Sequence, residues 1–211
     1  MTEPGLRERK KLRTHQAISD AAIHLFLRDG FDQVSVAQIA DAAEVSKRTL
    51  FKYFPTKEDL VVHRFADHVE EYAEVVTARS ADQSPLAALR AWHLAGLDDQ
   101  EPTTGLCDHP DVLSLYRLVL DTPSVTSRLR DYTLHGVDAL SDALRAANPA
   151  EDVVTARLAA TQVVAVLQML AEANWYAMFT GTSVAERYPE ATNAAERAFE
   201  LLGGGLATRY G

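Results

Sequence analysis

Two helix-start signals only eleven residues apart, at Ser35 and Ser46, constrain the fold more than any other feature of the sequence. Ser35 is followed three residues later by Gln38, the spacing of a capping box, in which each side chain bonds to the other residue's backbone amide. Ser46 precedes a second apolar-periodic run, anchored by Leu50 and Phe54 four residues apart. The sequence therefore predicts two short helices joined by a tight turn, which is a helix-turn-helix.

The first turn of the second helix carries side chains suited to reading DNA. With Leu50 and Phe54 directed inward, Lys47, Arg48 and Thr49 are left on the outer face. Two cations in a first helical turn oppose the helix dipole, so the stability of the helix does not explain them. Cations and hydroxyls at this end of a helix do match the groups that contact base edges in the major groove. We predict that this helix enters the major groove of DNA.

The stretch from Leu25 to Leu60 resembles the TetR family of one-component transcriptional regulators. The resemblance rests on four ordered segments, LFLRDGF, VAQIA, VSKRTLFKYF and PTKEDL. It implies an all-α protein with an N-terminal three-helix DNA-binding head, residues 1–57, and a larger helical-bundle body for effector binding and dimerisation, residues 58–211. The expected DNA-contacting residues are Ser35, Ser46, Lys47, Arg48, Thr49, Phe51, Lys52, Tyr53, Lys57 and Arg13.

Two positions depart from the family pattern. Glu44 occupies the turn position where the family usually has glycine, which places a negative charge near the DNA side. Phe51 replaces the usual tyrosine, which removes a hydroxyl for phosphate but leaves a ring that can touch a thymine methyl group. Both departures affect how the head meets DNA.

The net charge of −9 is unevenly distributed. Residues 1–57 carry 10 Lys and Arg against 7 Asp and Glu, a net of +3, whereas residues 58–211 carry 11 against 23, a net of −12. Because salt screens charges beyond about 8 to 10 Å, a basic head can meet phosphate despite an acidic body. The basic arm from Arg7 to Arg13 is expected to contact phosphate or the minor groove, the alternative being a disordered solubilising arm.

The rest of the chain shows helical patterns separated by Pro, Gly and polar breakers, and no strand alternation of any length. A helix from Glu58 to Val76 is expected to connect the head to the body. Further helices are expected at Pro85–Leu97, Asp111–Leu120, Pro123–Ala147, Glu151–Phe179 and Pro189–Leu202, with a loop at Asp98–Pro110.

The helix expected at Glu151–Phe179 is apolar on most of its circumference, so it should be buried on most sides. Packing against a second copy of the chain would cover a face that a monomer leaves exposed. The TetR resemblance implies the same, because members dimerise through their last two long helices. The expected interface residues are Leu167, Leu170, Ala195, Ala198, Phe199 and Leu202.

The body contains more aromatic and polarisable side chains than a plain helical bundle needs. The resemblance implies a ligand cavity among the body helices, for which the candidate residues are His68, Trp92, Tyr116, Tyr132, His135, Met169 and Trp175. The alternative for each of them is ordinary core packing. Since pockets in helical bundles are mostly apolar, the expected effector is a largely apolar small molecule.

Several functional classes are disfavoured by the sequence. No run approaches the roughly 18 uninterrupted apolar residues of a membrane span, and the N-terminus has no apolar core of a signal peptide. The single Cys107 suits a reducing compartment, so a cytoplasmic location is expected. Cys107 and His109 lack the spacing of a zinc site. No metal, cofactor or catalytic residue is expected, because no nucleotide-binding or hydrolase motif is present.

The sequence thus predicts a homodimeric, sequence-specific transcriptional regulator and not an enzyme. It would act as a repressor that a small, largely apolar ligand releases from an inverted-repeat operator. One alternative is an oligomeric helical adaptor whose head binds protein. The other, less favoured, is a small helical enzyme.

Overall fold

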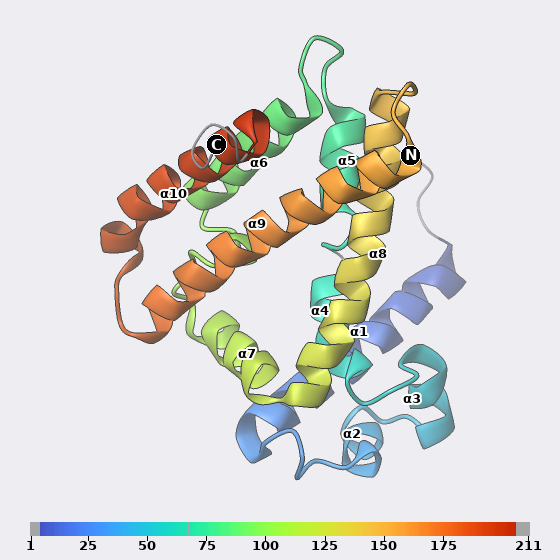
Figure 1. The fold of residues 1–211 in the computed structure, drawn as a ribbon. Coiled ribbons are helices and arrows are strands. Elements are labelled where there is room, and N and C mark those ends of the chain that lie inside the picture. The colour runs from blue at the N-terminus through green and yellow to red at the C-terminus, as the bar shows by residue number, and fades with distance from the viewer. Residues whose placement is uncertain (1–4, 67, 206–211) are drawn as a thin grey trace. The chain divides into compact units, whose positions relative to one another are not determined.

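The structure is a computed structural model that describes residues 5–66 and 68–205. Within these residues every regular element is a helix, and no strand occurs (Figure 1). The predicted all-α fold class is confirmed. The helices are α1 (Leu6–Asp29), α2 (Val36–Ala42), α3 (Lys47–Tyr53), α4 (Asp59–Ala66), α5 (Glu71–Ala78), α6 (Pro85–Asp98), the 3-10 helix η1 (Pro102–Thr104), α7 (Pro110–Asp121), α8 (Pro123–Ala147), α9 (Val153–Phe179) and α10 (Val184–Gly204).

Side-chain caps set several of the helix starts. The predicted capping box at Ser35 and Gln38 is present at the start of α2, and the Ser46 hydroxyl accepts from the Thr49 amide at the start of α3. Further caps are provided by Ser84 for α6, Asp152 for α9 and Ser183 for α10. Each cap satisfies amides that a first helical turn leaves without a partner.

The last helix begins earlier than predicted. The expected start was Pro189, but α10 begins at Val184, because Ser183 and Glu186 form a second capping box. Pro189 therefore lies inside the helix, where its ring nitrogen cannot donate the usual hydrogen bond. The capping box gives the amides of the first turn hydrogen-bond partners, so Ser183 and not Pro189 sets the start of α10.

The single helix expected from Glu58 to Val76 is wrong, because the structure has α4 and α5 with a break between them. Near the break, His68 Nδ1 lies 2.6 Å from Glu71 Oε1 in the first turn of α5. The Val69 carbonyl lies so close to Gly136 of α8 that a Cβ on that glycine would be 2.7 Å from its oxygen. This close approach, which only glycine permits, is a contact between distant segments that a local helix pattern does not reveal.

The chain divides into two compact units. The first comprises residues 1–66 and 114–130, and the second comprises residues 67–113 and 131–211, each within its described part. The grouping differs from the predicted boundary at residue 57, because Leu60, Val61 and Val62 are fully buried in the first unit. The assignment of DNA binding to residues 1–57 and of effector binding and dimerisation to residues 58–211 stays a prediction.

The first unit is built around α1, which packs against α2 and α4, while α2 packs against α3. Its core consists of large apolar side chains that are almost completely buried. They include Ile18 and Phe26 of α1, Ile39 of α2, Leu50 of α3 and Phe54, which directly follows α3. This core fixes the orientation of α3.

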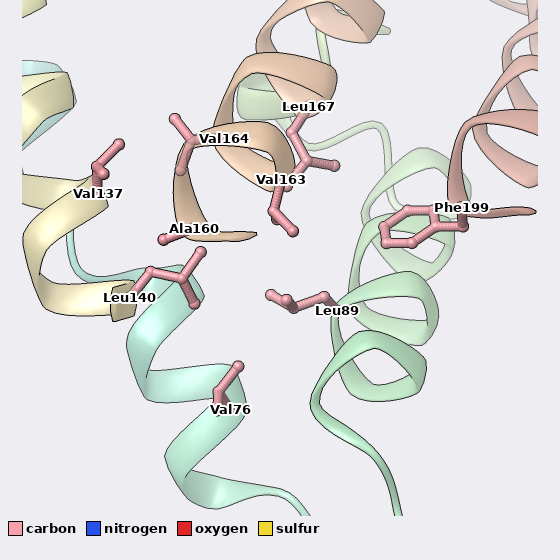
Figure 2. Close-up of a cluster of buried hydrophobic side chains, with 9 residues drawn as sticks. All are labelled: Val76, Leu89, Val137, Leu140, Ala160, Val163, Val164, Leu167 and Phe199. Atoms are coloured by element: carbon pink, nitrogen blue, oxygen red, sulfur yellow. The ribbon is translucent and has the colours of Figure 1, made fainter. Parts of the chain in front are cut away.

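The second unit has its main core where α5, α6, α8, α9 and α10 meet (Figure 2). Its buried members are Val76, Leu89, Val137, Leu140, Ala160, Val163, Val164, Leu167 and Phe199. A second cluster, formed by Leu97, Leu106, Met178, Ala191 and Ala195, joins α6, α9 and α10 to the segment after η1. Two cores along α9 hold this long helix in place.

Helix α9 is long and apolar enough to cross a membrane by length and composition alone. Its apolar run is interrupted by Gln162, Gln168 and Glu172. Its inner face, which includes Ala160, Val163 and Leu167, is buried in the main core of the second unit. One face of α9 therefore belongs to the core of the second unit.

Candidate nucleic-acid interface

The turn between α2 and α3 has a tight backbone. The Glu44 amide donates to the Asp41 carbonyl at 3.1 Å, and the Val45 amide donates to the Ala40 carbonyl at 2.9 Å. Glu44 adopts a left-handed conformation with φ of 53°, the region that glycine enters without cost. The position where the resemblance led us to expect glycine therefore has the backbone of a glycine position.

Helix α3 is anchored from one side. Leu50 and Phe54 are 0% and 1% exposed, and they hold the helix to the core of the first unit. Lys47 and Arg48 are exposed in the first turn. The structure thus places the two cations on the outer face, as the residue spacing predicted.

The remaining predicted contact residues of α3 differ in their freedom to reach DNA. Lys52 is exposed. The Phe51 ring is 46% exposed, so this ring is free to contact DNA. Tyr53 is half-buried, with its ring centroid 6.1 Å from that of His15. The Thr49 hydroxyl lies 2.8 Å from the Ser46 hydroxyl within the cap, so part of its bonding capacity is already used.

The hydroxyls of the two cap serines are also occupied. Ser35 Oγ accepts from the Gln38 amide at 3.3 Å and donates to Gln38 Oε1 at 2.8 Å. Ser46 Oγ accepts from the Thr49 amide at 3.0 Å. Both serines are exposed, but their structural role is to start helices α2 and α3.

The basic arm is helical from Leu6 onward and forms the first turns of α1. The alternative of a disordered arm therefore does not apply to these residues. Arg13 is exposed on α1, as are Arg9, Lys10 and Lys11. The side chain of Arg7 lies outside the described ones.

Lys57 is bound within the first unit. Its ammonium group donates a hydrogen bond to the Phe31 carbonyl and lies 4.3 Å from the centroid of the Phe31 ring and 5.5 Å from that of Phe26. Burial lowers the pKa of Lys57, and the nearby Asp32 and Glu58 carboxylates partly oppose this shift. The predicted phosphate contact of Lys57 stays a prediction, but the structure shows an internal partner for it.

An ion pair between Asp59 and Arg128 in the first unit was not predicted from the sequence. Asp59, 2% exposed, accepts from Arg128 Nε at 2.7 Å and from the Thr56 amide at 3.0 Å. Burial raises the pKa of Asp59, but the hydrogen bonds from Arg128 and Thr56 outweigh burial and lower it overall. The spacing of Thr56 and Asp59 signalled the local cap, whereas nothing in the sequence indicated that Arg128, 69 residues away, completes the pair.

Aromatic rings support the end of α3. The His15 ring of α1 stacks on Phe54 with centroids 4.4 Å apart and meets the His63 ring of α4 edge-on at 4.3 Å. Phe54 is therefore enclosed by α1 and α4. The ring of His15 connects the helix that carries Arg13 with the end of the helix that carries Arg48.

The predicted effector residues line neither of the two cavities described in the second unit, and their role in binding an effector stays a prediction. His68 pairs with Glu71, and the Trp92 ring meets Tyr72 edge-on at 5.4 Å. Two cavities of about 440 and about 300 Å³ in the second unit are lined by other residues. Tyr116 packs on Phe65 in the first unit, Tyr132 lies beside His135, Trp175 stacks near Phe179, and Met169 is 69% exposed.

Most of the predicted dimer residues are covered within the single chain, and their role in an interface stays a prediction. Leu167, Ala195 and Phe199 are buried in the cores of the second unit, so they do not provide a surface for a second copy. Leu170 and Leu202 are partly buried against the same cores, and Ala198 is half-buried. The apolar side chains that α9 exposes are instead Val153, Val154, Leu158, Met169 and Tyr176.

Around Cys107, the described part of the chain has no group of side chains suited to hold a metal ion. Within the described residues, no set of three or more His, Cys, Asp or Glu side chains could hold a metal ion. Cys107 is buried, and His109 Nδ1 accepts from the Asp111 amide at 3.3 Å, which places this histidine at the start of α7.

Comparisons with known proteins agree with this geometry. The TcmR transcriptional regulator of Streptomyces glaucescens is 37% identical over 86 residues, which are 41% of this chain and 38% of TcmR. The chain spans less than half of the length of the curated relatives it matches.

Two solved structures share the fold over almost the whole chain. A TetR-family regulator from Streptomyces coelicolor A3 aligns over 93% of this chain and 99% of its own, with 23% identity and a TM-score of 0.56. FadR from Bacillus subtilis, in complex with stearoyl-CoA, aligns over 90% and 98%, with 19% identity and a TM-score of 0.53. Residues 18–63, which contain the helix-turn-helix, match the bacterial regulatory proteins of the tetR family. Residues 18–63 therefore form a domain of the kind found in the tetR family of bacterial regulatory proteins.

Proposed function

We propose that this protein is a sequence-specific DNA-binding transcriptional regulator, a repressor that leaves its operator when a small, largely apolar ligand binds the helical body. It acts as a homodimer in the cytoplasm, without a cofactor and without catalysis. The single observation that carries the proposal is the orientation of α3, with Leu50 and Phe54 buried and Lys47 and Arg48 exposed.

With α3 in this orientation, different residues of the head contribute base preference and phosphate affinity. Lys47 and Arg48 lie at the end of the helix that contacts bases in this kind of head, so they set sequence preference. Arg13 and Lys52 are exposed cations that supply affinity for phosphate without regard to sequence. Lys57 acts mainly inside the head, since its ammonium already has the Phe31 carbonyl as partner.

Dimerisation follows from the outer face of α9. A two-fold dimer presents two copies of α3, so the operator is an inverted repeat with half-sites about one helical turn, or a multiple of it, apart. The exposed apolar residues of α9 supply the surface through which the second copy binds.

The effector acts through the second unit. Its helices carry the aromatic pair of Tyr72 and Trp92, which a ligand entering between α5 and α6 would separate. FadR, which shares the fold, binds stearoyl-CoA, a ligand with a long apolar chain, and this supports an apolar ligand here. A ligand shifts the equilibrium only by its differential affinity for the two arrangements of the protein, so operator DNA must weaken ligand binding by the same factor.

The decisive experiment measures binding to the DNA that flanks the protein's own gene and to random DNA of equal length. Arg48→Ala is expected to weaken specific binding by about 1 to 3 kcal/mol and to leave random binding much less affected. Arg197→Ala, which removes an exposed cation from α10, is the matched control and should leave both affinities unchanged. If Arg48→Ala weakens the affinity for both DNAs equally, Arg48 contacts only phosphate and does not set sequence preference.

The adaptor alternative predicts a different salt response. Contacts to phosphate make the logarithm of the binding constant fall with the logarithm of the salt concentration, by about 0.9 for each phosphate neutralised. A head that binds protein would show no such slope on DNA. Failure to bind DNA at low salt would favour the adaptor.

A further inference from the structure

We propose that Arg128 of α8 is a positioning residue for DNA recognition. Through Asp59 it holds the start of α4, and with it the end of α3, in the orientation that reads bases. This inference rests on the proposed DNA-binding function and adds to it a residue far outside the helix-turn-helix. Arg128 lies 69 positions after Asp59 in the sequence, yet both residues belong to the first compact unit.

The Asp59 carboxylate connects Arg128 to the link between α3 and α4. Its Oδ1 atom accepts from Arg128 Nε at 2.7 Å, and its Oδ2 atom accepts from the Thr56 amide at 3.0 Å. The Asp59 amide donates to the Thr56 hydroxyl at 3.2 Å. Thr56 is separated from Phe54, the cap residue of α3, only by Pro55, whose ring restricts the backbone. A displacement of the Asp59 carboxylate would therefore displace the end of α3.

The start of α4 does not need Arg128 in order to form. The reciprocal bonds between Thr56 and Asp59 already satisfy amides at this helix start, and the helix dipole favours a carboxylate there. Asp59 is 2% exposed, and an ion pair to a buried carboxylate adds little net stability, because both charges lose hydration. What the pair does supply is one defined geometry, since the guanidinium group donates in a fixed plane.

The part of α7 and α8 that carries Arg128 is itself fixed within the first unit. The Tyr116 ring of α7 meets the Phe65 ring of α4 edge-on, with centroids 5.0 Å apart. The Thr126 hydroxyl of α8 donates to the Val119 carbonyl of α7 at 2.7 Å, and Val119 is 2% exposed. Helix α4 is thus contacted near both of its ends by this part of the unit, and Arg128 extends from a packed support.

Base reading makes a stricter demand on geometry than phosphate binding does. Lys47 and Arg48 are exposed in the first turn of α3, so the position of their charged groups depends on how this helix is held. A site that works through directed contacts must be held within about 0.5 Å by its supporting residues. Contacts to phosphate, in contrast, carry no sequence information. Loss of the Arg128 support should therefore weaken binding to a specific site more than binding to random DNA.

Two substitutions that remove the same charge test the positioning role. The Arg128 side chain is 35% exposed, so a direct contact to phosphate is the competing explanation. Arg128→Met removes every donor, whereas Arg128→Gln keeps an N–H donor at the position of Nε. Fluorescence anisotropy measures the affinity of each full-length variant for the DNA that flanks the protein's own gene and for random DNA, at several salt concentrations.

We expect Arg128→Met to weaken binding to the flanking DNA about tenfold and binding to random DNA less than about twofold. Arg128→Gln should remain within about threefold of the parent, because it still bonds to Asp59. The salt dependence should be the same for all three proteins. If the two variants lose affinity equally and the salt slope falls by about 0.9, Arg128 contacts phosphate and the proposal is wrong.

A matched control and a double variant complete the test. Arg130→Met removes the same charge from an exposed position two residues away on α8, and it should leave both affinities unchanged. In an Asp59→Ala background, Arg128→Met should cause no further loss, since Arg128 acts through Asp59. Additive losses would show that Arg128 acts independently of Asp59 and would overturn the proposal.

Two further outcomes are distinguishable. A pair with a purely structural role would lower the free energy of unfolding of Arg128→Met but leave the affinity of the folded protein for the flanking DNA unchanged, which also contradicts the proposal. If the parent binds neither DNA, the proposed function itself fails. If the parent binds the flanking DNA specifically and Arg128→Met binds it equally well, only the positioning role is wrong.

Discussion

Glu44 shows how one residue of the head departs from its preferred conformation. Its φ of 53° lies in the left-handed region, which costs a residue with a Cβ atom roughly 1 kcal/mol or more. The side chain is exposed and has no packing role that would offset this cost. The residue therefore combines backbone strain with a negative charge in the turn that precedes α3.

Replacing Glu44 with glycine should raise the free energy of unfolding by about 0.5 to 1 kcal/mol, because relief of the strain exceeds the entropy that glycine loses on folding. Urea denaturation measures the change. Glu44→Ala is the control, since it removes the charge but keeps the Cβ atom. Both variants should bind DNA more tightly than the parent, whereas only Glu44→Gly should be more stable. Equal stability of the two variants would contradict the role of strain.

His93 is a buried polar residue in an apolar environment. It is 3% exposed on α6, with its ring centroid 6.5 Å from that of Trp92 and 6.3 Å from that of Phe199, and its Nε2 atom has no hydrogen-bond partner among the described residues. Burial lowers the pKa of His93 to about 4, so the folded protein holds it neutral at physiological pH.

Stability should therefore depend on pH through His93. An unfolded histidine has a pKa of about 6.5, so between pH 6.5 and about 4 the unfolded state binds more protons than the folded state. The stability from His93 is complete above pH 6.5 and falls as the pH falls, by about 2 kcal/mol at pH 5.

The measurement compares urea denaturation at pH 7 and pH 5 for the parent and for His93→Gln, which is polar but does not titrate. Between pH 7 and pH 5, the free energy of unfolding should fall by about 2 kcal/mol more for the parent than for the variant. His135→Gln serves as the control for changing a histidine in the same unit. An identical pH dependence for the parent and His93→Gln would show that His93 is not the responsible group.

At the scale of elements, the short helix η1 is fixed to α9 by a polar contact and a glycine. Asn174 of α9 is 2% exposed, donates to the Thr104 carbonyl at 2.9 Å and accepts from Arg187 Nε of α10 at 2.9 Å. Gly105 follows η1 with φ of 76°, and a Cβ atom there would lie 2.2 Å from the Ala171 carbonyl oxygen. Three segments distant in sequence thus meet at one buried amide.

Gly105→Ala should destabilise the protein by more than about 2 kcal/mol, because the clash is with backbone and cannot be relieved by a side-chain rotation. Gly181→Ala is a matched control, since Gly181 also has a positive φ, of 87°, but has nothing within 4 Å of its added Cβ. The free energy of unfolding of Gly181→Ala should fall by only about 1 kcal/mol, which is the cost of the left-handed conformation for alanine. Chemical denaturation distinguishes the two, and equal losses would mean that η1 is not closely packed on α9.

The elements also show what the sequence could reveal. Local signals were reliable where a side chain bonds to its own helix start, as at Ser35 and Ser46. They failed where a distant segment decides the outcome, as at the break near Val69. At α10, the serine cap outweighed the proline that was expected to start the helix.

The candidate DNA site was predictable for a similar reason. The outward direction of Lys47 and Arg48 follows from the spacing of two neighbouring anchors on a single helix. The effector residues were chosen by chemical type alone, and the structure distributes them among separate contacts, because tertiary packing and not composition determines which side chains meet.

At the scale of the whole molecule, α9 is the helix with two apolar faces. Its inner face fills both cores of the second unit, whereas Val154, Leu158, Met169 and Tyr176 are 63%, 57%, 69% and 72% exposed. These positions are separated by 4, 11 and 7 residues, which are close to whole numbers of helical turns. The exposed residues therefore form one stripe along the helix, of the kind that marks an interface in a soluble protein.

The stripe allows a sharper test of dimerisation than a change at Leu202, which is partly buried against the main core and whose loss would also damage folding. Met169→Glu adds a charge to the centre of the stripe without entering a core. Leu120→Glu is the control, because Leu120 is 53% exposed on α7 and outside α9. Sedimentation should show monomers for Met169→Glu and dimers for Leu120→Glu.

Operator binding should be lost together with the dimer, since a monomer presents only one copy of α3 and forfeits the second half-site. The free energy of unfolding of the Met169→Glu monomer, extrapolated to the same protein concentration, should then fall by the contribution of the lost interface alone. A Met169→Glu protein that remains dimeric would place the interface on another face. One that is monomeric but keeps full operator affinity would mean that a single head is sufficient for recognition, and the inverted-repeat operator would be the part of the proposal to discard.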